Sequence, residues 1–184
     1  MIQEDPAPII KEASRKRLSN FARYIKPDTI FAPFHLVYYK ALDLFAHGHI
    51  RKLIVQQPPQ HGKSEGSSRI LPAYMLGLNP DLKICIGSYS STIAEDFNQD
   101  VQRIIQGEEF QMLFPESFTA GMRKDVNDRS YKCNTQRTDM VNHRGGLRAV
   151  GRGGPLTSKT VDVSILDDVY KDPAEGNSPV IREA

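Results

Sequence analysis

The chain has 184 residues, of which 39% are hydrophobic and 25% charged, and its formal net charge at pH 7 is +2. This length allows one buried core, so a single globular domain is expected, and so small a net charge does not by itself indicate a polyanionic partner. Cys85 and Cys133 have no His or Cys at metal-ligand spacing, and no apolar stretch is long enough to span a bilayer, which argues against a zinc site, a disulfide framework and a membrane span.

Residues 1–30 are predicted to form a polar, Pro-rich arm followed by a helix. Leu18, Phe21, Ala22 and Ile25 recur at helical spacing, and Pro27 ends the pattern. Residues 31–184 are then expected to form the main domain, beginning with a second helix at about residues 33–46.

The next segments alternate between strand and helix. KLIVQ at 52–56 indicates a short buried strand, a helix is expected from Ser64 toward Gly77, and KICIGS at 83–88 indicates a second strand. A long helix should follow from Thr92, which forms a capping box with Glu95. Its apolar face would consist of Ile93, Phe97, Val101, Ile104 and Ile105.

Positive charge is concentrated in residues 121–160, which carry nine Lys or Arg and three Asp, a local net charge of +6. The rest of the chain therefore carries −4. Glycine pairs at 145–146 and 153–154 and the lack of a helical period predict short strands or hairpins. The segment could line the path of duplex DNA, or it could be an ordinary solvated surface.

VDVSIL at 161–166 predicts a third strand that ends at Asp167 and Asp168. Strands alternating with helices build a mainly parallel sheet with right-handed crossovers. The predicted fold class is therefore α/β, and a ligand would sit beyond the carboxyl ends of the strands.

Gly62-Lys63-Ser64 lies where the first strand would meet the following helix. The usual phosphate-binding pattern has a further glycine five residues before Gly62, but this chain has Gln57 there, so the match is partial. In such a loop Lys63 would reach the β- and γ-phosphates and the Ser64 hydroxyl would hold Mg²⁺. The same tripeptide also occurs by chance.

Asp167 and Asp168 would supply the second half of such a site. A carboxylate at the end of an apolar strand is the Walker B layout, in which Asp167 would bind Mg²⁺ and Asp168 would orient the attacking water. The alternative is a strand that ends in a polar turn. Together, the two motifs favour a site that hydrolyses a nucleotide.

PPQHGKSE at 58–65 resembles the PPRHGKSE loop of the large subunits of tailed-bacteriophage terminases, the ATPases that drive DNA into procapsids. In that family the first glycine is commonly absent. The resemblance extends over about residues 20–184, through LGLNP, SYSSTIAEDFNQDVQRII, LFPE, VGRGGPLTSKTVD and ILDDVYKDPAEGNSP.

The resemblance implies a P-loop NTPase of the ASCE type, a three-layer sandwich that is incomplete at its carboxyl end in this chain. ATP and Mg²⁺ are the implied cofactors, and Phe34 and His35 are implied to contact the adenine, although both could be ordinary core residues. The implied nucleotide-binding loop residues are Pro59, Gln60, His61, Gly62, Lys63, Ser64 and Glu65.

Gln60 departs from the family, which generally has an arginine there that is thought to touch the γ-phosphate. The missing charge would have to come from elsewhere. Arg148 and Arg152 are candidates for an arginine finger, and both could equally be solvated charges or DNA contacts.

The implied function is that of a packaging motor in the host cell cytoplasm. Its partners would be double-stranded DNA, the portal protein, the small terminase subunit and other copies of the chain in a ring. Because the chain ends at Ala184, sixteen residues after Asp168, no nuclease carboxylate cluster can be assigned and no cleavage activity is expected. The alternatives are a helicase-like nucleic-acid ATPase and a catalytically inactive assembly module.

Overall fold

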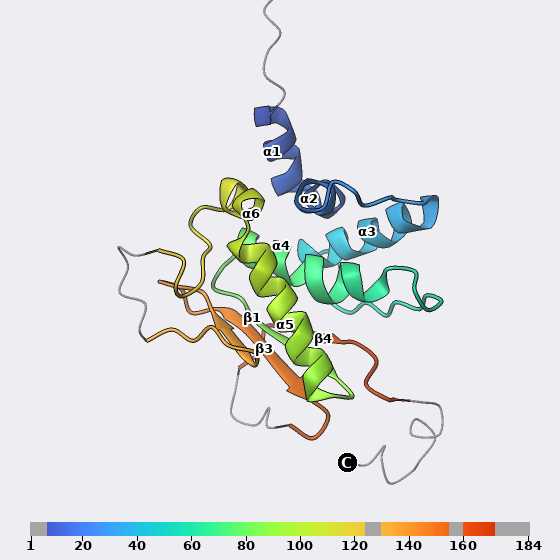
Figure 1. The fold of residues 1–184 in the computed structure, drawn as a ribbon. Helices are drawn as coiled ribbons and strands as arrows, with labels where there is room; N and C mark the ends of the chain where they lie inside the picture. The colour runs from blue at the N-terminus through green and yellow to red at the C-terminus, as the bar shows by residue number, and fades with distance from the viewer. Residues whose placement is uncertain (1–6, 124–129, 155–159, 172–184) are drawn as a thin grey trace, which may run out of the picture.

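The structure, a computed structural model, describes residues 7–123, 130–154 and 160–171, and these form an α/β fold (Figure 1). The helices are α1 (Ala7–Lys16), α2 (Leu18–Ile25), α3 (Pro33–Ala46), α4 (Leu71–Leu78), α5 (Ser91–Gln106) and α6 (Glu108–Leu113), with a π-helical turn, η1 (Glu65–Ile70), directly before α4. The strands are β1 (Lys83–Ser88), β2 (Arg137–Asp139), β3 (Gly146–Gly151) and β4 (Val163–Leu166). The predicted helices at 18–25 and 33–46 and the predicted strand at 83–88 are confirmed.

The described strands form one mostly parallel sheet in the order β2-β3-β1-β4. β1 pairs in parallel with β3 on one side and with β4 on the other, and the short strand β2 adds antiparallel to β3. The predicted hairpin in the basic segment is thus confirmed, and the third predicted strand is two residues shorter than expected. This arrangement brings the carboxyl ends of β1, β3 and β4 to one edge of the sheet.

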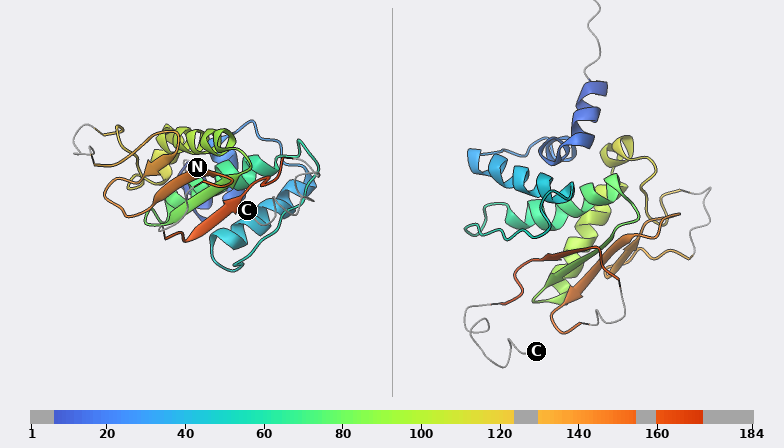
Figure 2. Two further views of the ribbon diagram at one scale, coloured as in Figure 1. Left: turned by 90° about the horizontal axis from the view of Figure 1, so that it is seen from below. Right: turned by 180° about the vertical axis from the view of Figure 1, so that it is seen from behind.

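Helix α5 lies across one face of the sheet, in front of it in Figure 1 and behind it in the right-hand view of Figure 2. The helix buries Phe97, Val101 and Ile105 against the sheet and its neighbours, as the apolar period predicts. The predicted capping box is wrong, because the helix begins at Ser91 and Thr92 already lies in its first turn.

The amino-terminal helices are part of the main core. Leu18 and Phe21 of α2 are fully buried, and the Phe21 ring packs 5.2 Å from the Tyr74 ring of α4 and 6.2 Å from the Phe110 ring of α6, centroid to centroid. Helix α1 (Ala7–Lys16) precedes α2, so residues 7–25 form two helices where the sequence predicted one. Among the described residues, no helix is both long and apolar enough to cross a membrane.

The predicted strand at 52–56 is wrong. Leu53 and Val55 pack against the core while Ile54 is 89% exposed, so the side chains alternate as in a strand. The backbone, however, pairs with no described strand. A cavity of about 470 Å³, the edge cavity, is lined by this segment on one side and by β4 on the other. An apolar alternating pattern alone cannot supply the ladder that defines a strand.

The predicted helix after Ser64 is confirmed, but its first part is wider than an α-helix. The Leu71 N–H donates to the Gly66 carbonyl, five residues back rather than four. Pro72, which follows, has no N–H to donate to the Ser68 carbonyl, and its ring would crowd that carbonyl in an α-helix. The proline therefore accounts for the π-helical turn at this place.

Candidate functional site

The loop that precedes η1 turns sharply at two residues. Gln60 and Gly62 have φ angles of 63° and 77°, both in the left-handed region that glycine tolerates best. The His61 ring folds back so that Nδ1 lies 2.7 Å from the Pro59 carbonyl oxygen, and the Gly62 carbonyl accepts a hydrogen bond from the Gly66 N–H at 3.1 Å. The turn thus leads directly into a helix start, where backbone N–H groups lack partners within the helix.

Lys63, the first residue of that helix, meets both predicted carboxylates. Its Nζ lies 3.0 Å from Asp167 Oδ1 and 2.5 Å from Asp168 Oδ1. The two aspartates follow β4 at the carboxyl edge of the sheet, where the Asp167 N–H still continues the β1 ladder by donating to the Gly87 carbonyl. The structure therefore brings together a lysine and an acid pair that are about a hundred residues apart in the chain.

The two carboxylates differ in environment. The Asp167 side chain is buried, whereas the Asp168 side chain is 67% exposed and its backbone has a φ of 46°. Burial raises the pKa of Asp167, but hydrogen bonds from Ser64, Ser68 and Lys63 outweigh burial, and the pKa lies below its ordinary value. Burial lowers the pKa of Lys63, but its contacts with Asp168 and Asp167 raise it overall. Lys63 and Asp167 are therefore charged at neutral pH.

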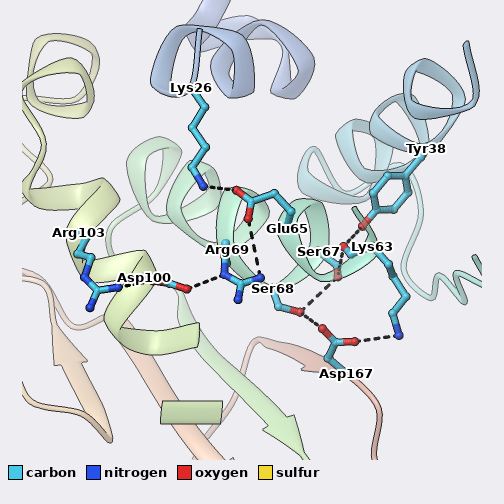
Figure 3. Close-up of polar contacts among 10 residues, drawn as sticks. All are labelled: Lys26, Tyr38, Lys63, Glu65, Ser67, Ser68, Arg69, Asp100, Arg103 and Asp167. Atoms are coloured by element: carbon cyan, nitrogen blue, oxygen red, sulfur yellow. Dashed lines mark hydrogen bonds and ion pairs between the residues drawn. The ribbon is translucent and has the colours of Figure 1, made fainter. Parts of the chain in front are cut away.

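Side chains of η1 and α3 hold Lys63 and Asp167 in place (Figure 3). The Ser68 hydroxyl, which is fully buried, donates to Asp167 Oδ2 at 2.7 Å. The Lys63 carbonyl accepts hydrogen bonds from the Ser67 hydroxyl at 2.9 Å and from the Tyr38 hydroxyl of α3 at 2.5 Å. Helix α3 is thereby joined to the first turn after the loop.

Tyr38 also explains a glycine at the start of η1. A Cβ atom at Gly66 would lie 2.6 Å from Tyr38 Cε1, which is closer than carbon atoms can approach. Burial raises the pKa of the Tyr38 phenol to about 12, so the hydroxyl remains a hydrogen-bond donor throughout the neutral range. The close contact with Tyr38 therefore requires a residue without a side chain at position 66.

Phe34 and His35, at the start of α3, lie against the loop. The His35 Nδ1 accepts a hydrogen bond from the Ala32 N–H at 3.0 Å, so the proton resides on Nε2, which lies 3.2 Å from the His61 carbonyl oxygen and can donate to it. The Phe34 ring is 43% exposed and its centroid lies 5.6 Å from that of the His61 ring. The side chains of Phe34 and His35 therefore both lie beside the loop.

A cavity of about 470 Å³, the loop pocket, opens over these groups. Its volume falls within the range of small-molecule sites, about 300 to 1,000 Å³. The lining residues are Gln57, Pro58, Pro59, Gln60, Gly62, Lys63, Ser64, Glu65, Arg69 and Asp168. The loop pocket therefore combines a helix start, two cationic side chains and two carboxylates.

Ser64 and Asp167 are the residues here that suit a magnesium ion. Both offer hard oxygen ligands, and the Ser64 side chain lies close enough to Asp167 to lower the pKa of its carboxyl. Such a pair would leave most of the coordination to water and phosphate, as Mg²⁺ usually does. Among the residues that the structure describes, no group of three or more His, Cys, Asp or Glu side chains forms a metal site of protein ligands alone.

Arg148 and Arg152 lie away from the loop pocket. Arg148 stands in the middle of β3 and lines two other cavities, one of which also contains Lys132 and Arg137. The Arg152 backbone, which follows β3, donates to the Ser88 carbonyl at 2.9 Å. Neither arginine lines the loop pocket within this chain.

The sequence interpretation missed Tyr38, Ser68 and Arg69. Nothing in the sequence connects Tyr38 with Lys63. Ser67 follows Lys63 by one helical turn, a spacing that could have indicated their contact. The position of Ser68 depends on the π-helical turn, which has no simple sequence pattern.

We compared the chain with protein-family models, curated proteins and solved structures, and none of the three comparisons gives a match.

Proposed function

We propose that the chain is an ATP-hydrolysing P-loop domain, the motor domain of a terminase large subunit that packages double-stranded DNA. The observation that carries the proposal is the meeting of Lys63 with Asp167 and Asp168 at the loop pocket. A lysine beside a helix start and a carboxylate pair beyond a parallel strand are the groups that phosphoryl transfer from a nucleotide requires.

The phosphate chain would bind at the start of the helix. Backbone N–H groups after Gly62 and the positive end of the helix favour anions at this place. Lys63 would exchange its ion pair with Asp168 for the phosphates, because a phosphate chain offers more negative charge than one exposed carboxylate. Nucleotide binding would thus release the Asp168 carboxylate.

Asp168, once released, would accept a hydrogen bond from the attacking water and hold it in line with the terminal phosphate. Asp167, fixed by Ser68, would remain charged and would hold Mg²⁺ together with Ser64. When bound, the ion would supply charge stabilisation for the phosphate oxygens. Phe34 and His35 would bind the base beside the loop.

The assignment to DNA packaging rests on the resemblance of the loop and its flanking blocks, and on the basic hairpin formed by β2, β3 and their connection (137–151). Arg137 and Arg148 lie directly opposite each other in this hairpin. Two like charges in such a pair destabilise a sheet, and Asp139, which pairs with Arg137 at 2.6 Å, leaves the charge of Arg148 for a polyanion to compensate. Double-stranded DNA would be that polyanion, and the portal protein, the small terminase subunit and further copies of the chain would be the other partners.

The test is ATP binding and turnover by the wild type, Lys63→Ala and a matched control, Lys40→Ala. Lys40 is an exposed lysine of α3 outside the loop pocket. We expect K63A to lose ATP affinity and turnover by on the order of 100-fold or more, and K40A to match the wild type. Equal, background-level turnover in all three proteins would contradict the proposal; if ATP binding persists, it would favour an inactive ATP-binding module.

A further inference from the structure

A chain of charged side chains runs from the loop pocket across three elements (Figure 3). Lys26, at the end of α2, pairs with Glu65 of η1. Arg69, one turn after Glu65, has its Nη1 3.8 Å from Glu65 Oε2 and its Nε 2.6 Å from Asp100 Oδ2 of α5. The other Asp100 oxygen accepts a hydrogen bond from Arg103 at 2.6 Å. Arg69 is therefore the member of this chain that connects the helix after the loop with α5.

Arg69 also lines the loop pocket, although it follows Lys63 by six residues. Side chains of a helix lean toward its amino terminus, so a long side chain on the second turn reaches back to the first. A second cavity, of about 480 Å³, shares Glu65 and Arg69 with the loop pocket and extends to Asp100 and Arg103. Arg69 thus lines both cavities.

The guanidinium of Arg69 is held on two sides. Its central carbon lies 4.8 Å from the centroid of the Phe97 ring, a cation–π contact, and its Nε donates to Asp100. The distance from Nη1 to Glu65 is too long for a hydrogen bond. A side chain fixed in this way loses little entropy when the Nη groups bind a further anion.

The charge balance of the loop pocket gives Arg69 its significance. Gln60 is neutral, and among the described residues that line the pocket the cations are Lys63 and Arg69. Arg148 and Arg152 do not reach the pocket within this chain. We propose that Arg69 contacts the phosphate chain of the bound nucleotide, held in position by Asp100 and Phe97. This inference rests on the proposed function and adds a binding residue to it.

The experiment measures how well tripolyphosphate and, separately, adenosine displace a bound fluorescent ATP analogue. The variants are Arg69→Gln and a matched control, Arg103→Gln. Arg103 bonds the same aspartate but is 72% exposed and does not line the loop pocket. We expect R69Q to lower the affinity for tripolyphosphate about 10- to 100-fold, because a charge-assisted hydrogen bond is lost. The affinity for adenosine should stay unchanged. R103Q should match the wild type for both competitors.

Two further variants keep the test decisive if R69Q folds poorly. Arg69→Lys retains the charge without the planar fork, so tripolyphosphate affinity should fall to an intermediate value. Asp100→Asn removes the carboxylate that fixes Arg69, so it should lower the affinity for tripolyphosphate and leave the affinity for adenosine unchanged. Unchanged tripolyphosphate competition in R69Q and R69K, or an equal loss in R103Q, would overturn the role of Arg69. Failure of the wild type to bind any nucleotide would instead overturn the proposed function, and this inference with it.

Discussion

The loop pocket and the basic hairpin differ in how many of their cationic side chains have a carboxylate partner. In the loop pocket Lys63 and Arg69 each meet a carboxylate from a distant element, at 3.0 Å or less. In the hairpin, Arg137 pairs with Asp139 of its own strand at 2.6 Å. Arg148 lies opposite Arg137, and no carboxylate of the described residues forms an ion pair with its side chain. The loop-pocket cations are thus held by carboxylates of distant elements, whereas Arg148 in the hairpin has an arginine as its cross-strand neighbour.

The difference indicates what each region can recognise. Cations with fixed partners present a defined geometry, which suits a small ligand of fixed shape such as a phosphate chain. A sheet surface with excess positive charge attracts any regular polyanion and does not require a particular register. Variants in the two regions should therefore fail in different ways.

The largest effect is expected for Asp168→Asn in the loop pocket. The amide cannot act as a base toward water, so ATP turnover should fall by on the order of 100-fold or more, while ATP affinity stays within a few-fold of the wild type. Steady-state hydrolysis and equilibrium binding measure the two quantities. Retained turnover in D168N would remove Asp168 from the catalytic role.

Gly66→Ala should destabilise the fold around the loop pocket through a steric clash. The new methyl group would meet the Tyr38 ring at 2.6 Å, so we expect a loss of about 1–3 kcal/mol in the free energy of unfolding, measured in urea. Tyr38→Leu in the same chain removes the ring and should recover part of the loss. Strictly additive effects of the two changes would contradict direct contact.

Acid should affect the loop pocket through Asp167. Its folded-state pKa lies below the ordinary value of 3.8, so the stabilisation by its charge is complete above that value and disappears as the pH falls through the folded pKa. Asp167→Asn should therefore be less stable than the wild type at pH 7, and the two melting temperatures should converge below about pH 3.8. A constant difference down to pH 2 would contradict the assignment.

The smallest effect on the isolated protein is expected in the hairpin. Charge reversal at Arg144 and Arg148 should leave basal ATP turnover unchanged but reduce its stimulation by duplex DNA. The salt dependence should weaken as well, by roughly 0.9 in logarithmic slope for each DNA phosphate that the variant no longer neutralises. DNA titrations at several salt concentrations measure both effects. Unchanged stimulation would make the hairpin an ordinary surface.

The sequence was most informative where function requires a residue type at a fixed place. The motifs at Lys63 and at Asp167-Asp168 were each partial, yet the alternation of strands and helices predicted that they would meet at one edge of the sheet. The same local reasoning succeeded for β1, and for α5 apart from its cap, because helical and strand periods follow directly from side-chain burial.

The sequence failed where a feature depends on partners far away in the chain. Residues 52–56 have the composition of a strand, but a strand also needs a neighbouring ladder. Helix α5 begins at Ser91, and Ser90 takes the N-cap position. Ser90, Ser91 and Thr92 are adjacent hydroxyl residues, and the local sequence does not distinguish which of them caps the helix. Tyr38 contacts Lys63 only through the packing of α3 on the helix after the loop.

The π-helical turn before Pro72 determines which way the side chains after the loop point. Its extra residue shifts the positions of the side chains after it, so that Ser68 meets Asp167 and Arg69 meets Asp100. Removal of a single residue between Glu65 and Leu71 would restore ordinary winding and turn both side chains away from these partners. The spacing between the loop and the proline should thus tolerate substitution far better than a change in length.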